Sequence, residues 1–159
     1  MTFGEKQTNP EPETGLGWRG DMQADYLYPN GAAGDKFFKN LMEKETFLAC
    51  TCPECKTIYL PPRIYCEDCY VEIPEDKWKE VVPEGTVRLF TVAYLNAEGV
   101  KLEKPWVMAL VDIEGTDGAW LAKLKVKDLK KDYIGAKVKA VLRPKGKREG
   151  TMKDILYFE

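Results

Sequence analysis

The chain has 159 residues, of which 44% are hydrophobic and 31% are charged, and its formal net charge is -2. This composition is typical of a soluble globular protein and excludes a disordered or collagen-like chain. No apolar run approaches the roughly 20 residues that a membrane-spanning helix needs. The polar start MTFGEKQTNPEPETG lacks the apolar stretch of a signal peptide, so we expect a cytoplasmic protein.

The chain contains no histidine, the residue that most often serves as a general base at neutral pH. A Ser-His or Cys-His nucleophile is therefore excluded within this chain. Charge is unevenly distributed, because residues 1–85 carry 9 Lys/Arg and 16 Asp/Glu, whereas residues 86–159 carry 15 and 10. This asymmetry indicates two modules, of which the basic one is suited to an anionic partner.

Residues 1–34 are rich in proline and glycine and have no sustained hydrophobic period, so we interpret them as an extended arm. A disordered tail is the simplest interpretation, but large aromatic side chains are unusual in a purely solvating segment. We expect the arm to dock on a partner through its aromatic and apolar side chains. These are Trp18, Tyr26, Leu27 and Tyr28.

The next segment, DKFFKNLMEK, has apolar residues near i, i+3 and i+4 spacing, which predicts a helix over 35–44 that begins at Gly34-Asp35. A short strand then leads into the cysteines, so residues 35–48 form a helix and a lead-in strand. The apolar helix face is a second candidate for partner contact. It consists of Phe37, Phe38, Leu41 and Met42.

Two CxxC pairs face each other across ten residues in CPECKTIYLPPRIYCEDC. Such pairs curl into two knuckles whose sulfurs close a tetrahedral shell around one metal ion. The odd number of cysteines, five, and the lack of an export signal favour a metal over a disulfide framework. We predict a metal-binding ribbon over 49–75. Its ligands are Cys52, Cys55, Cys66 and Cys69.

Zinc is the favoured ion, because a closed four-sulfur site without an evident redox partner is usually structural. Rubredoxin-type iron uses the same ligand set, and a four-iron cluster is a further alternative. Cys50 lies outside the paired pattern. We interpret it as a small, partly buried residue beside the ribbon, in preference to an alternative ligand or a reactive thiol.

After a charged linker at 76–85, the hydrophobic pattern changes to that of β-strands. A helical turn is expected at 128–133, between the third and fourth strands. Five short strands in this order fit a small closed barrel of the OB type over 86–159, with a sandwich fragment as the alternative. The predicted fold class is therefore mainly β. The expected strands span 86–95, 106–113, 119–126, 137–143 and 154–158.

Taken together, these segments resemble a family of small acyl-CoA-associated proteins that join a rubredoxin-like zinc ribbon to an OB-fold domain. The resemblance covers about residues 35–159. It is carried by the CxxC pairs with the intervening PPR, by GTVRLFTV at 85–92, by ALVDI at 109–113 and by the IGxxV turn at 134–138.

Members of that family are commonly complexed with thiolase-superfamily enzymes, whose large subunit supplies the catalytic cysteine and histidines. The resemblance implies a non-catalytic accessory subunit of a heteromeric acyl-CoA thiolase, with a structural Zn²⁺ and with a coenzyme A ester bound within the complex. The arm is longer and richer in aromatics than the family's minimal form. A specialised thiolase for aromatic acyl-CoA esters is therefore open as the partner.

The basic segment RPKGKREG at 143–150 is the candidate contact with the phosphates of coenzyme A. Charge-assisted hydrogen bonds from Lys145, Lys147 and Arg148 would hold a diphosphate or a ribose phosphate. A solvated loop of mixed charge is the alternative.

Two other functions remain open. OB barrels bind single-stranded nucleic acid through a basic groove with stacked aromatics. Here the stacking residues would be Phe90, Tyr94, Trp106 and Trp120, and the groove would be lined by Lys123, Lys125, Lys137, Lys139 and Arg143. A sequence pI of about 5.4 argues against this reading. The second is a rubredoxin-like electron carrier, which would be coloured by ferric iron.

Overall fold

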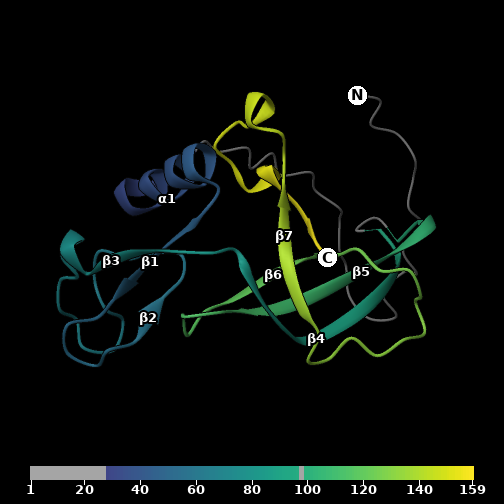
Figure 1. Ribbon diagram of the computed structural model, residues 1–159, viewed down its shortest axis with the longest axis horizontal. Helices are drawn as coiled ribbons and strands as arrows, with labels where there is room; N and C mark the ends of the chain where they lie inside the picture. Colours follow the sequence, from purple (N-terminus) through teal and green to yellow (C-terminus); the bar gives the residue numbers. More distant parts are fainter. Residues whose placement is uncertain (1–27, 97–98) are drawn as a thin grey trace, which may run out of the picture.

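The computed structural model describes residues 28–96 and 99–159. In this part of the chain a helix, a three-stranded sheet and a closed five-stranded barrel follow one another (Figure 1). The result confirms the predicted fold class. The helix and strands are α1 (Gly31–Lys44), β1 (Phe47–Thr51), β2 (Ile58–Tyr59), β3 (Trp78–Val81), β4 (Glu84–Leu95), β5 (Lys101–Ile113), β6 (Ala119–Leu124), β7 (Lys137–Leu142) and β8 (Ile155–Phe158).

Helix α1 begins at Gly31, four residues before the predicted start. The two alanines at 32–33 are strong helix formers and extend the helix toward the N-terminus. Gly34 and Asp35 therefore lie inside the helix, and the prediction that they cap it was wrong. At the other end, Glu45 adopts the left-handed conformation and terminates the helix.

The three-stranded sheet has the order β2-β1-β3, so β1 is its central strand. Cys50 of β1 is opposite Tyr59 on one side and Trp78 on the other. The predicted linker at 76–85 was wrong in one respect, because it contains β3. Lys79 and Glu80 of β3 are both exposed, and two successive exposed residues hide the alternation by which a strand is recognised.

The barrel closes in the order β4-β5-β6-β8-β7, with β7 paired back onto β4. All five predicted strands are present, although β5 starts five residues earlier than predicted, at Lys101. The predicted helical turn at 128–133 was wrong. Asp128 Oδ1 accepts a hydrogen bond from the N–H of Lys130 at 2.9 Å, and Tyr133 Oη donates to the Asp128 carbonyl at 2.8 Å. These local bonds stabilise turns in place of a helix.

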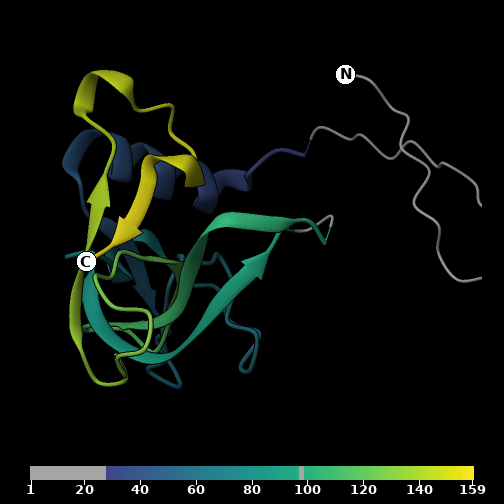
Figure 2. The same cartoon turned by 90° about the vertical axis from the view of Figure 1, so that its right-hand side faces the viewer.

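Strands β4 and β5 approach each other closely at Gly85. A Cβ atom at this position would lie 1.9 Å from the carbonyl oxygen of Asp112. Since that distance is far below van der Waals contact, only glycine fits here without moving a strand. The long β4–β5 hairpin then projects beyond the barrel (Figure 2), whereas the end of α1 lies beside the loop between β7 and β8 (Figure 1).

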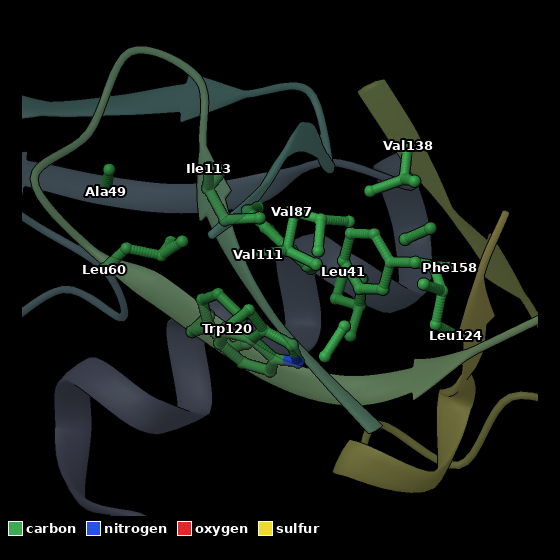
Figure 3. Close-up of a cluster of buried hydrophobic side chains, with 14 of the residues drawn as sticks. Leu41, Ala49, Leu60, Val87, Val111, Ile113, Trp120, Leu124, Val138 and Phe158 are labelled. Carbon is green, nitrogen blue, oxygen red and sulfur yellow. The ribbon is translucent and has the colours of Figure 1, made fainter. Parts of the chain in front are cut away.

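A single aromatic core joins the helix, the ribbon sheet and the barrel. The ring centroid of Trp120 in β6 lies 5.7 Å from that of Phe37 in α1 and 5.0 Å from that of Phe47 in β1. Figure 3 shows Trp120 and Leu41 in the same cluster as Phe158 of β8. The ribbon and the barrel are therefore one packed body.

Hydrogen bonds at the junction support this packing. The N–H of Ile58 donates to Asp117 Oδ2 at 2.8 Å, and the N–H of Asp117 donates to the Ile58 carbonyl at 3.0 Å. In residues 28–96 and 99–159, no helix has the length and apolar character needed to cross a membrane.

Candidate metal centre

Two turns of the same form hold the four paired cysteines. The N–H of Cys52 and that of Cys66 each donate to the carbonyl five residues further along the chain, at 2.9 Å in both turns. The residue after the second cysteine of each pair is left-handed, with φ of 66° at Lys56 and 58° at Tyr70. The two CxxC pairs thus form two matching knuckles.

The knuckles bring four sulfur atoms together. The Sγ atoms of Cys52, Cys55, Cys66 and Cys69 all lie within 4.8 Å of one another. Cys55 Sγ and Cys66 Sγ are 3.7 Å apart. A tetrahedral zinc site with Zn–S bonds of about 2.3 Å has sulfurs about 3.8 Å apart. The four cysteines are therefore positioned for one metal ion.

A buried tyrosine contacts this sulfur cluster. Tyr59 Oη lies 3.2 Å from Cys66 Sγ and donates a hydrogen bond to Asp68 Oδ2 at 3.2 Å. The guanidinium of Arg63 lies over the Tyr59 ring, 4.8 Å from its centroid. Sequence reasoning missed Tyr59, because only the pairing of β2 with β1 places it beside the second knuckle.

The sulfurs differ in acidity. Hydrogen bonding with Tyr59 lowers the pKa of Cys66 to about 6. Hydrogen bonding with Cys55 raises the pKa of Cys69 to about 12. Burial raises the pKa of Cys52, whereas the Thr57 side chain lowers that of Cys55. A metal ion binds thiolates, so its binding releases the protons of those sulfurs that are still protonated.

The fifth cysteine belongs to the packing of the ribbon. Cys50 is fully buried, and its Sγ accepts a hydrogen bond from the N–H of Arg63 at 3.2 Å. Burial raises the pKa of its thiol, which keeps it protonated and unreactive. This agrees with the interpretation of Cys50 as a residue buried beside the ribbon.

The residues predicted to meet a partner have different surroundings. Phe37 and Leu41 are buried in the aromatic core, so they are not available to a partner and this part of the predicted face must be corrected. Phe38 and Met42 are half-buried, and Tyr28 is 77% exposed. The other predicted contacts, Trp18, Tyr26 and Leu27, lie outside the described residues.

Within the basic segment, Arg148 is used inside the molecule. Its Nη1 donates to the carbonyl of Met42 at 3.0 Å, its Nη2 lies 2.8 Å from Glu45 Oε1, and its side chain is only 4% exposed. The hydrogen bond with Arg148 also lowers the pKa of Glu45. Arg148 therefore fastens the loop to the end of α1. Lys145 and Lys147 are exposed.

A buried carboxylate organises the same loop. Asp154 accepts hydrogen bonds from the N–H groups of Glu149, Gly150 and Thr151, at 2.7 to 3.2 Å. Burial alone would raise the pKa of Asp154, but these backbone donors outweigh it and the pKa is lowered. Asp154 thus holds the part of the loop that follows the two exposed lysines, residues 149–151.

Comparison with known proteins agrees with both parts of the fold. Residues 43–75 match the family model described as ChsH2, rubredoxin-like zinc ribbon domain, and residues 78–143 match that described as ChsH2, C-terminal OB-fold domain. A DUF35 domain-containing scaffold protein of Methanocaldococcus jannaschii is 26% identical over 108 residues, which cover 67% of this chain and 74% of that protein.

Two solved structures are similar. The structure described as Ltp2-ChsH2(DUF35) aldolase aligns with 86% of this chain and 97% of its own, at 22% identity and a TM-score of 0.54, and so shows the fold alone. A DUF35 family protein of unknown function from Sulfolobus solfataricus is 30% identical, with a TM-score of 0.57, over 70% of this chain and 78% of its own. With both domain models and this relative in agreement, the chain belongs to the DUF35 family of zinc-ribbon and OB-fold proteins.

Proposed function

We propose that this chain is a non-catalytic accessory subunit that scaffolds a heteromeric acyl-CoA enzyme of the thiolase superfamily. The observation that carries the proposal is that its thiols are placed for a structural role and not for catalysis. Four cysteines close on one another, the fifth is buried, and the chain has no histidine to activate any of them. The scaffold description of the archaeal relative and the aldolase complex with a DUF35 chain support the same role.

We propose Zn²⁺ as the ion, held by Cys52, Cys55, Cys66 and Cys69. Four thiolates complete the tetrahedral coordination of a zinc ion and leave no open position for water or substrate. The ion would therefore stabilise the fold and take no part in catalysis. The five unpaired cysteines suit a reducing compartment such as the cytoplasm. Visible absorbance of the purified protein would instead support iron and the role of an electron carrier.

For the partner surface, we propose the arm together with Tyr28, Phe38 and Met42. Since α1 begins at Gly31, the informative truncation removes residues 1–27 and leaves the helix intact. We expect the truncated chain to keep its metal and to bind the enzyme subunit about tenfold more weakly, or about 1.4 kcal/mol. Isothermal titration calorimetry with the purified enzyme subunit measures this. Equal affinity would reduce the arm to a tail without a role in assembly.

For coenzyme A, we propose that Lys145 and Lys147 approach its phosphates in the complex, while Arg148 positions their loop. The exposure of the two lysines and the fixed loop support this assignment. Charge removal in a Lys145→Ala and Lys147→Ala double variant should raise the KM for the acyl-CoA ester and leave assembly unchanged. An unchanged KM would leave the segment as a solvated loop.

The proposal as a whole is tested by purification from the native cell. We expect the chain to elute with an acyl-CoA enzyme in a fixed ratio, identified by mass spectrometry, and turnover to require that enzyme. An isolated chain that converts an acyl-CoA ester would contradict the non-catalytic role. A chain that elutes alone under all gentle conditions would contradict the accessory role.

A further inference from the structure

Strand β6 has an open edge. It pairs with β5 over six residues, from Ala119 to Leu124, but with β8 only at Leu124 opposite Phe158. In the described part of the chain, residues 119–123 therefore have a strand partner on one side alone. The N–H and C=O groups on the other side of such a strand are available to pair with an added strand.

Two cavities lie beside β6, and the first of them borders its unpaired edge. One, of about 280 Å³, lies between β6 and the segment that leads into β8, and its lining includes Leu121, Ala122, Met152 and Leu156. The second, of about 250 Å³, lies at the other end of β6. Leu121 is 64% exposed and Met152 is 51% exposed, so apolar surface faces solvent beside the unpaired edge.

We refer to the two cavities together as the groove, and the charged side chains that line it are all basic. Lys123 lines both cavities and Lys153 lines the first, whereas Lys125, in the second, is already paired with Glu159 at 2.8 Å. The described residues place no acidic side chain in either lining. Lys123 Nζ is 3.8 Å from the ring centroid of Trp106, and neither Lys123 nor Lys153 forms an ion pair with a described residue. An occupant with negative charge would therefore complement the groove.

We propose that the β6 edge binds an extended acidic and apolar peptide segment as an added strand. Side chains two residues apart on a strand lie on the same face, as Leu121 and Lys123 do on β6. A segment paired with β6 would place an apolar side chain beside Leu121 and, two positions away, an Asp or Glu beside Lys123. The recognised pattern is thus an apolar and an acidic residue separated by one residue.

The test uses the full, metal-loaded chain and a library of random linear peptides. We expect selection to enrich peptides with an apolar and an acidic residue two positions apart. Binding of a selected peptide should slow the exchange of the backbone amides of residues 119–123. Leu121→Asp and Lys123→Glu should each weaken that peptide by about tenfold or more. A peptide with Lys in place of its acidic residue should regain affinity for the Lys123→Glu variant.

Ile134→Asp is the matched control, because Ile134 is 62% exposed and lines neither cavity. It should leave the affinity unchanged. No enrichment over background, enrichment of peptides that lack the acidic residue, or affinity that survives both groove substitutions would overturn the proposal. The library contains no enzyme, so these outcomes are separate from the fate of the accessory-subunit proposal.

Discussion

The ribbon and the barrel share an aromatic junction but are stabilised by different means. The core particular to the ribbon consists of five buried residues, three of which are cysteines. The larger cluster contains aliphatic and aromatic side chains from α1, β1 and all five barrel strands. The ribbon therefore depends on what its sulfurs hold, whereas the barrel depends on the burial of apolar surface.

Strand β1 contributes residues to both cores. Its first part packs in the large cluster through Phe47 and Ala49, whereas Cys50 and the residue that follows the strand, Cys52, belong to the ribbon core. We therefore expect loss of the metal to unfold the knuckles without releasing the start of β1. A small metal-binding module can thus be held in a fixed orientation by a hydrophobic core that is formed mainly by other parts of the chain.

The largest effect is expected when the second knuckle loses its ligands. A Cys66→Ser and Cys69→Ser double variant should lose its metal, because binding to four thiolates contributes about 10–16 kcal/mol in comparable zinc modules. Elemental analysis should find about one equivalent of zinc in the wild-type chain and almost none in the variant. Cys50→Ala is the control and should retain the metal, since Cys50 lies outside the four-sulfur set. A variant that keeps its zinc would assign the site to other ligands.

The next largest effect concerns the shared junction. Trp120→Ala removes a buried ring that contacts Phe37 and Phe47, and it should lower the free energy of unfolding by about 3–5 kcal/mol. Urea denaturation measures this change. Tyr94→Ala, at a position that is 56% exposed, should change stability by about 0.5 kcal/mol or less. Similar losses in the two variants would argue against a common core for ribbon and barrel.

A smaller effect is expected at the tyrosine beside the sulfurs. Tyr59→Phe removes the hydroxyl that contacts Cys66 and Asp68, and should weaken zinc binding by about 10- to 100-fold. Competition with a coloured chelator measures the affinity. Tyr65→Phe is the matched control, because Tyr65 is 60% exposed and belongs to neither buried core cluster. If both variants bind zinc as the wild type does, Tyr59 only packs against the site.

The smallest effect concerns the buried carboxylate of the basic loop. Asp154→Asn should cost about 1–3 kcal/mol at neutral pH, because an amide satisfies the three backbone donors less well. The pKa of Asp154 is lowered in the folded state, so its contribution is present above the unfolded value of about 3.9 and is lost as the pH falls through the folded value.

The stability difference between wild type and Asp154→Asn should therefore shrink below about pH 4. Thermal unfolding across this pH range measures it. Asp76→Asn, at an exposed carboxylate, should show little difference at any pH. A stability difference between wild type and Asp154→Asn that stays constant down to low pH would contradict the lowered pKa of Asp154.

Much of this fold was predictable, because its signals are local. The two CxxC pairs indicated the knuckles, and alternating apolar residues indicated the five barrel strands. Strand β3 was not predictable from its period, because it is defined by pairing with β1 and exposes two successive charged residues. The start of α1 was missed because Gly34 and Asp35 resemble a cap while standing inside a helix.

The candidate site was predictable in its ligands but not in its surroundings. Tyr59 comes to Cys66 through strand pairing, and Arg148 comes to Met42 and Glu45 from more than 100 positions away in the chain. Neither contact has a local signal. The same limitation affected the helix face, where Phe37 and Phe38 are equally apolar, but Phe37 is buried in the common core whereas Phe38 packs against it and is half-buried.

The central claim is that the four cysteines bind a structural metal ion. Amide hydrogen exchange of the same chain before and after zinc removal tests this claim most directly. The account predicts that protection disappears in both knuckles and persists in β4 to β8. Protection that is unchanged in the knuckles after zinc removal would contradict a structural metal. Protection lost equally from knuckles and barrel would contradict the division between a metal-held ribbon and a core-held barrel.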